Sequence, residues 1–167
     1  LATESVRIEA PIPGTRLVGV EIPNVRKESV SLRSLLESDR WKKEQAALCF
    51  AVGKDISGNT IIANLAKMPH LLIAGTTGSG KSVMTNILIS SLLYRNAPSD
   101  MKLIIVDPKQ VEMAQYNDIP HLLTPIITAT DKALSAMKWA VNEMERRYAC
   151  LAEERVKKIE DYNEKMK

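Results

Sequence analysis

The residues best suited to chemistry lie between positions 71 and 82, where an apolar run leads into a glycine-rich segment. Gly75 is followed by four residues and then by Gly80-Lys81-Ser82, which is the spacing of a phosphate-binding loop. The glycines permit positive φ angles and let main-chain N–H groups approach a phosphate closely. Lys81 adds a positive charge for the β- and γ-phosphates, and the Ser82 hydroxyl is a ligand for Mg²⁺. The residues predicted to bind nucleotide phosphate are Gly75, Thr76, Thr77, Gly78, Ser79, Gly80, Lys81 and Ser82.

Asp107 is the second residue that could take part in chemistry. It ends the apolar run Leu103–Val106, and a carboxylate at the end of a buried strand can hold Mg²⁺ in a nucleotide hydrolase. Pro108 follows it, at a position where motor proteins prefer a second acid. Three roles stay open for Asp107: a catalytic Mg²⁺ ligand, a positioning residue and a strand-end cap.

The elements around the loop predict an α/β fold. The segment Leu71–Ala74 reads as a strand, and apolar residues at helical spacing predict a helix from about Ser82 to Tyr94, whose positive N-terminus faces the same anion. Leu103–Val106 has no polar alternation, as expected for a strand buried on both faces of a parallel sheet, and a third strand is expected near Pro125–Thr128. Alternating strands and helices predict a parallel sheet flanked by helices.

The longest predicted helix begins after Thr130, which we expect to be its N-cap, with Asp131 in the first turn. Its apolar positions form one stripe, which we expect to face the core. This stripe consists of Leu134, Met137, Val141, Met144, Tyr148 and Leu151. The phase of the pattern slips near Glu154, so a bend or a second helix is expected there.

Residues 1–66 are predicted to be rich in β-structure and to flank the core formed by residues 67–167. Ser31 can cap a short helix that continues to about Glu37, and Gly53–Asn59 reads as a hairpin turn between two strands. We interpret the first region as an N-terminal β-rich edge and the second as the phosphate-loop core.

Composition indicates a globular chain. The 167 residues are enough for one domain, and a hydrophobic content of 45% argues against disorder. The net charge of +3 neither indicates nor excludes a nucleic-acid partner. Cys49 and Cys150 lie far apart in apolar or helical patterns, so we interpret both as buried free thiols in a reducing compartment and predict a cytoplasmic location. No apolar run approaches the length of a membrane span.

Further segments along the chain match one family in the expected order. Besides residues 63–82, the matching segments are 6–14, 53–58, 107–109, 116–124, 139–141 and 143–148. Together they resemble the FtsK/SpoIIIE family of bacterial double-stranded DNA translocases, and the resemblance covers nearly the whole chain. One departure is Asn64, where the family usually carries Asp.

The resemblance implies a RecA-like motor domain that forms a hexameric ring around duplex DNA and hydrolyses ATP during chromosome segregation, in cell division or sporulation. Carried over to this sequence, residues 75–82 would bind ATP and Mg²⁺, with Lys81 as the principal catalytic residue. No strand after Thr128 ends in the Asp-Glu pair of such motors, so the C-terminal part of the motor is expected to be absent. The membrane anchor is expected to precede Leu1, and the principal DNA contacts are expected to follow the chain.

Two alternatives from other classes stay open. A P-loop phosphotransferase would use Asp107 and would turn over a small acceptor regardless of DNA. A non-hydrolysing assembly module would bind a nucleotide only to order an interface. We expect the isolated chain to bind Mg-ATP weakly and to hydrolyse it poorly, because neighbouring subunits normally complete such sites.

Overall fold

A computed structural model describes residues 6–24, 26, 28–68 and 70–167. The strands are β1 Arg7–Glu9, β2 Gly19–Glu21, β3 Cys49–Lys54 and β4 Thr60–Asn64. The helices are α1 Leu32–Leu36, α2 Asp39–Lys43, α3 Lys81–Arg95, α4 Thr130–Glu153 and α5 Ile159–Lys165, with short 3₁₀ segments η1 Leu65–Lys67 and η2 Ala114–Tyr116. No helix in the described part of the chain is long and apolar enough to cross a membrane.

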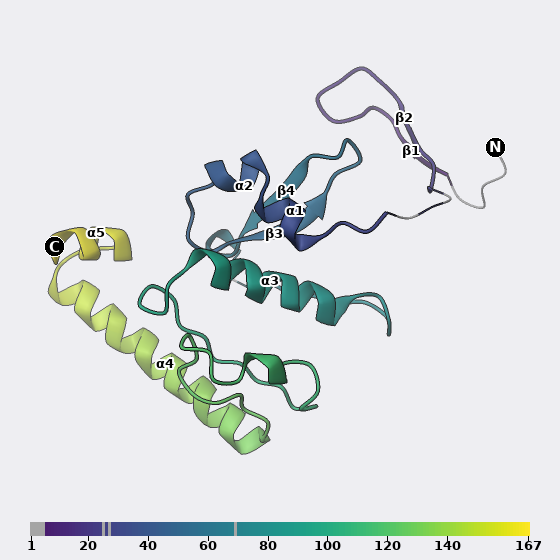
Figure 1. Ribbon diagram of the computed structural model, residues 1–167. Helices are drawn as coiled ribbons and strands as arrows, with labels where there is room; N and C mark the ends of the chain where they lie inside the picture. The colour runs from purple at the N-terminus through teal and green to yellow at the C-terminus, as the bar shows by residue number, and fades with distance from the viewer. Residues whose placement is uncertain (1–5, 25, 27, 69) are drawn as a thin grey trace.

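Two antiparallel hairpins form the N-terminal region. β1 pairs with β2, and this hairpin lies apart from the other elements in Figure 1. β3 pairs with β4 across the predicted turn, where the Asp55 carboxylate accepts the backbone N–H groups of Ser57 and Asn59. The hairpin expected around Gly53–Asn59 is therefore confirmed, whereas the division of the chain after residue 66 stays a prediction.

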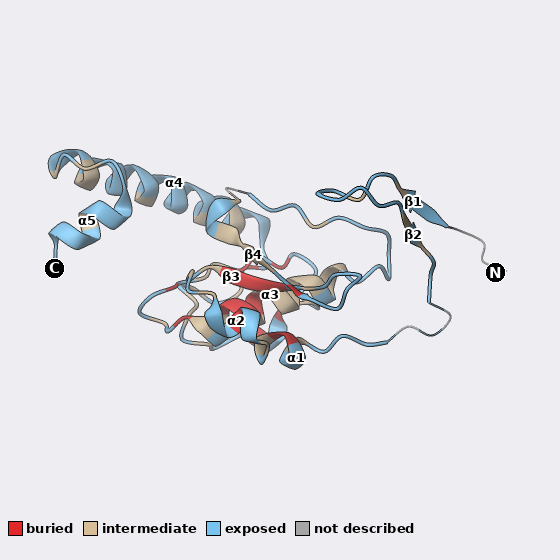
Figure 2. Cartoon of the chain, turned by 90° about the horizontal axis from the view of Figure 1, so that it is seen from above, coloured by how far each residue is buried: buried red, intermediate tan, exposed pale blue. Residues whose placement is uncertain are grey.

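Two short helices cover the β3–β4 hairpin. Ser31 caps α1 as predicted, since its hydroxyl accepts the backbone N–H of Ser34. Ser38 caps α2 in the same way, a helix that the sequence interpretation missed. Around them lies a buried apolar cluster that contains Leu35, Trp41, Cys49 and Ala51. Figure 2 shows the buried residues gathered in this part of the molecule.

Helix α3 lies between this unit and the segment that follows it (Figure 1). On one side, the Ser91 hydroxyl accepts the backbone N–H of Ala51 in β3. On the other side, Ile89 belongs to a second apolar cluster with Ile105, Met113 and Tyr116. Both cores therefore meet on α3, which holds the phosphate loop against the rest of the fold.

The predicted parallel pairing is present but interrupted. Leu103 bridges Leu122 and Val106 bridges Ile127, both in parallel orientation. The register shifts between the two bridges, and Pro125 lies within the shifted stretch. Because proline has no N–H to donate, it cannot continue a hydrogen-bond ladder. The continuous strands expected at 103–106 and 125–128 are therefore reduced to separate bridges.

The strand predicted at Leu71–Ala74 is not formed. Leu72 is 89% exposed, and within the described residues no backbone hydrogen bond joins this segment to a neighbouring strand. A strand depends on such a neighbour, because its backbone groups have no partners within the segment. The apolar run is therefore only the entry to the phosphate loop in this structure.

Helix α4 begins as expected, except that Ala129 is the N-cap and Thr130 is the first helical residue. The prediction that its apolar stripe packs into the core is wrong, since α4 contains no buried residue and Met144 remains 48% exposed. The helix stands off from the bridged segments, and a groove of about 770 Å³ lies between Met101 and Ile104 on one side and Trp139 on the other. The expected bend is confirmed by the left-handed residue Arg155 and by α5.

Candidate phosphate-binding site

The backbone of the phosphate loop has the conformation that its glycines predict. Gly78 has φ of 77° and Gly80 has φ of 96°, values that residues other than glycine rarely adopt. The backbone N–H of Ser79 donates to the carbonyl of Thr76 at 3.1 Å and closes the turn. Gly80 is the N-cap of α3 and leaves the first helical turn without a side-chain cap.

Gly75 is required for a different reason from the other two glycines. A Cβ at this position would lie 2.3 Å from Ser79 Oγ and 3.1 Å from Ser79 Cβ. Gly75 therefore allows two parts of the loop to approach closely, whereas Gly78 and Gly80 supply positive φ angles. The expectation of positive φ angles is therefore confirmed at Gly78 and Gly80 and is wrong at Gly75, where the absence of a side chain permits the close approach instead.

Lys81 is folded back onto its own loop. Its Nζ donates to the carbonyl oxygens of Gly75 at 2.7 Å and Thr76 at 2.8 Å. These carbonyls hold the ammonium group against the loop, and a phosphate can replace them as acceptor. Residues 74–80 are exposed, so a phosphate can reach the loop directly.

The residues present fit a nucleotide phosphate and its metal ion. The uncapped first turn of α3 offers free backbone N–H groups and the positive end of the helix dipole. Lys81 lies at the start of this turn, and Ser82 follows it as a half-buried residue. The roles of residues 75–82 stay predictions, supported by this geometry.

Asp107 holds a loop together through its carboxylate. Oδ1 accepts the backbone N–H groups of Lys109 and Gln110, each at 3.2 Å, and Oδ2 accepts those of Glu112 and Met113, each at 3.0 Å. Asp107 is only 6% exposed. Burial raises the pKa of the carboxyl, but the four N–H groups outweigh it, so the pKa lies below its usual value. The geometry favours the positioning role, and a catalytic role of Asp107 stays a prediction.

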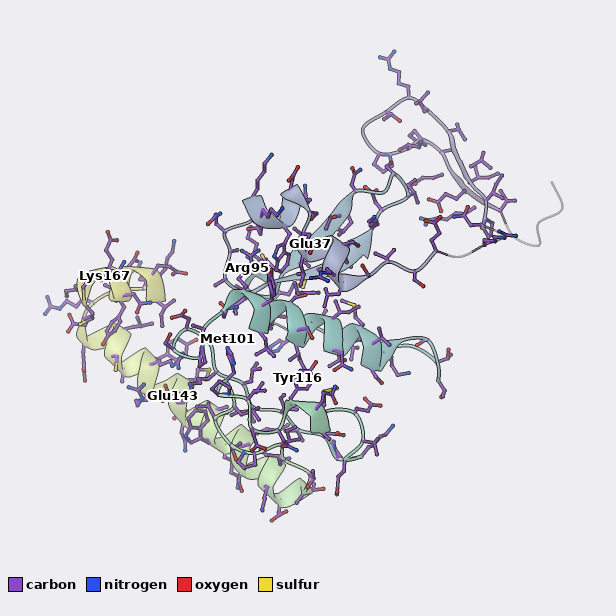
Figure 3. All side chains as sticks on the ribbon, in the orientation of Figure 1. Glu37, Arg95, Met101, Tyr116, Glu143 and Lys167 are labelled. Atoms are coloured by element: carbon purple, nitrogen blue, oxygen red, sulfur yellow. The ribbon has the colours of Figure 1, made fainter. Side chains whose placement is uncertain are left out.

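Asn86 is a polar residue of α3 that the sequence interpretation missed, and its side chain contacts the η2 segment. The Asn86 Oδ1 accepts hydrogen bonds from the Tyr116 hydroxyl at 2.7 Å and from Gln115 Nε2 at 2.8 Å. Tyr116 is labelled between α3 and η2 in Figure 3. The only signal in the sequence was a polar residue four positions after Ser82 on the helix.

Two other polar residues have structural partners. His121 Nε2 lies 2.9 Å from the carbonyl oxygen of Asn96. Asn64, where the resemblance led us to expect Asp, caps η1 by accepting the N–H of Ala66 at 2.9 Å.

Comparison with known proteins places this geometry in a family. The model of the FtsK/SpoIIIE family matches residues 31–167. The chain is 56% identical over its whole length to the DNA translocase FtsK of Clostridium tetani, of which it spans 22%. It is 53% identical over 166 residues to the DNA translocase FtsK of Haemophilus influenzae, covering 99% of this chain and 31% of that protein.

A solved structure shows the same fold. The monomer form of the pCW3 conjugation coupling protein TcpA, with ATPγS, has a TM-score of 0.63 and 26% sequence identity to this chain. The similarity covers 96% of this chain and 42% of that one. This likeness and the family match support a RecA-like P-loop fold, as the sequence predicted. The chain belongs to the FtsK/SpoIIIE family.

Proposed function

We propose that this chain is the ATP-binding part of an ATP-driven double-stranded DNA translocase. The observation that carries the proposal is the loop of residues 75–82, in which two glycines have positive φ angles and the Lys81 ammonium group bonds to the carbonyl oxygens of Gly75 and Thr76. The loop lies in a chain whose relatives are named DNA translocases. The names of these relatives supply the DNA part of the proposal.

Within this function, the chain's own residues bind and orient the phosphates. Backbone N–H groups of the loop and of the first turn of α3 bind the phosphate oxygens. Lys81 exchanges its two carbonyl partners for the β- and γ-phosphates, and Ser82 Oγ would hold Mg²⁺. The ion supplies charge neutralisation between the two phosphates when it is bound. We assign Asp107 to positioning, because both of its oxygens already accept backbone N–H groups.

The proposal extends to the assembly and its place in the cell. We propose that the protein works as a ring of identical subunits around duplex DNA, with a cytoplasmic motor attached to the bacterial membrane through another part of the protein. Chromosome segregation is the corresponding role. The names of relatives that span more than this chain support the DNA partner. The ring, the membrane attachment and the cellular role are what the resemblance to the family implies.

The test is ATP turnover by the intact protein, with and without linear duplex DNA. We expect DNA to stimulate turnover and Lys81→Ala to abolish it, whereas the exposed control Lys138→Ala on α4 keeps wild-type turnover. ATP turnover that does not change with DNA but requires a small acceptor would instead support the phosphotransferase alternative. Nucleotide binding that survives Lys81→Ala undiminished would contradict the assignment of the phosphate loop.

A further inference from the structure

A polar contact joins the phosphate-loop helix to the segment that contains Asp107. Asn86 follows Ser82 by four residues on α3, so the two lie on the same face, one turn apart. From this position, Asn86 Oδ1 accepts the Tyr116 hydroxyl at 2.7 Å and Gln115 Nε2 at 2.8 Å. Two side chains of the η2 segment therefore meet one oxygen of the helix that carries the phosphate loop.

Tyr116 transmits this contact because its ring is fixed. The residue is 8% exposed and packs in one cluster with Ile89, Ile105 and Met113. Its backbone N–H donates to the Met113 carbonyl at 3.0 Å. A buried aromatic ring in close packing has few alternative rotamers, so its hydroxyl and the backbone of Met113 move together.

Met113 is in turn bound to Asp107. Its N–H is one of the four that the Asp107 carboxylate accepts, and the loop 107–113 wraps around that buried group. Gln110 has φ of 61°, an uncommon conformation for a residue other than glycine, which the bonds to the carboxylate hold in place. The loop is thus rigid at its base and exposes Lys109 and Gln110 at its tip.

Phosphate binding must change the hydrogen bonds of Lys81, at the phosphate-loop end of this chain of contacts. Lys81 Nζ is bonded to the Gly75 and Thr76 carbonyls at 2.7 and 2.8 Å. A bound phosphate would compete with these carbonyls for the ammonium group and would accept hydrogen bonds from the N–H groups of the first turn of α3. Asn86 lies in the next turn and is the first α3 side chain after Ser82 that bonds to the 107–116 segment.

We propose that Asn86 and Tyr116 are positioning residues that couple nucleotide binding at the phosphate loop to the order of the 107–113 loop. The proposal rests on the proposed function, because it requires the phosphate loop to bind nucleotide. In the nucleotide-bound protein, the four amides held by Asp107 open less often, and Lys109 is presented in one fixed orientation. By linkage, opening of the 107–113 loop weakens nucleotide affinity by the same factor by which bound nucleotide suppresses the opening.

Amide hydrogen exchange of peptides covering 107–116 tests the coupling, with and without saturating Mg-ATPγS. We expect nucleotide to slow exchange by about fivefold or more, the lower end of typical coupling factors. In Tyr116→Phe, which keeps the packed ring, and in Asn86→Ala, the ratio of rates with and without nucleotide falls toward one. The matched control is Tyr94→Phe, which removes a hydroxyl from a 68% exposed residue of α3 and keeps the wild-type ratio.

The outcomes separate the two proposals. A purely structural role for Asn86 and Tyr116 would speed exchange equally in both states and leave the ratio unchanged, which would overturn the coupling. Wild-type protein that binds ATPγS without any change in the 107–116 peptides would overturn it as well. If wild-type protein bound no ATPγS at all, the phosphate-loop assignment would fail first and the coupling with it. The proposal is supported if the ratio of exchange rates with and without nucleotide falls toward one in both variants and keeps its wild-type value in Tyr94→Phe.

Discussion

The guanidinium group of Arg95 lies 4.3 Å from the centre of the Trp41 ring. Its Nη1 donates to the carbonyl oxygen of Glu44 at 2.6 Å, and its Nη2 donates to that of Trp41 at 3.0 Å. Arg95, labelled in Figure 3, is the last residue of α3, and Trp41 lies in α2. The guanidinium group therefore connects the end of α3 to α2.

The first prediction is that Arg95→Ala lowers the free energy of unfolding by about 2–3 kcal/mol, from the lost cation–π contact and the two hydrogen bonds made by a charged group. Urea unfolding at pH 7 measures the change. The control Arg33→Ala removes an exposed arginine whose ion pair with Glu37 is on the surface, and it should cost less than about 1 kcal/mol. Equal effects of both substitutions would show that Arg95 does not fasten α3.

Gly75→Ala should weaken ATPγS binding by at least about tenfold, because positions within a phosphate loop tolerate little displacement. The added Cβ would collide with Ser79, at 2.3 Å from Oγ and 3.1 Å from Cβ. Adding Ser79→Ala removes the shorter contact and should restore part of the affinity, which isothermal titration would detect. Ser79→Ala alone is the control. Full affinity in Gly75→Ala would mean that the close approach is unimportant for binding.

Asp107 makes a pH-dependent contribution to stability. Its folded-state pKa is lowered, so the contribution is present above the unfolded value of about 3.9 and is lost as the pH falls through the folded value. Asp107→Asn leaves one acceptor oxygen for four N–H groups and should lower the urea midpoint at pH 7, and it should lower the midpoint less at pH 3, which is below the unfolded value.

The matched control for that substitution is Asp118→Asn. Asp118 is exposed and has φ of 67°, which asparagine adopts as readily as aspartate. This variant should keep the wild-type midpoint at both pH values. If Asp107→Asn gave the same profile as Asp118→Asn, the carboxylate would not be holding the 107–113 loop.

The two cysteines should differ in reactivity. Cys49 is 1% exposed, and burial followed by the negative charge of Glu44 raises the pKa of its thiol. Cys150 is only half-buried on α4, so the expectation of two buried thiols is wrong for this residue. Iodoacetamide at pH 7.5 should modify Cys150 well before Cys49 when followed by mass spectrometry, and the difference should vanish in urea. Faster labelling of Cys49 in the folded protein would contradict its place in the core.

Local sequence determined the parts of this fold that depend on neighbouring residues. The glycine spacing predicts the phosphate loop and the start of α3 within one residue, and Ser31 predicts the cap of α1. The β3–β4 turn is equally local, since Asp55 bonds within its own turn. In each case the stabilising group and its partner lie within a few positions, so a pattern along the chain contains the whole interaction.

Only the tertiary structure decided the remaining features. The apolar stripe of α4 has the right spacing for a core helix, yet spacing cannot say whether another element lies close enough to cover it. The register shift around Pro125 depends on which segment pairs with 103–106.

The contacts of Asp107, Asn86 and Tyr116 near the phosphate loop were likewise not predictable from the sequence. The sequence placed Asp107 at a strand end but not its four backbone partners, because their approach depends on how the loop folds around it. Asn86 and Tyr116 are separated by 30 positions, and their contact exists only because one packed core holds η2 against α3. The sequence therefore predicts the phosphate loop, and the tertiary packing decides which distant side chains contact the helix that follows it.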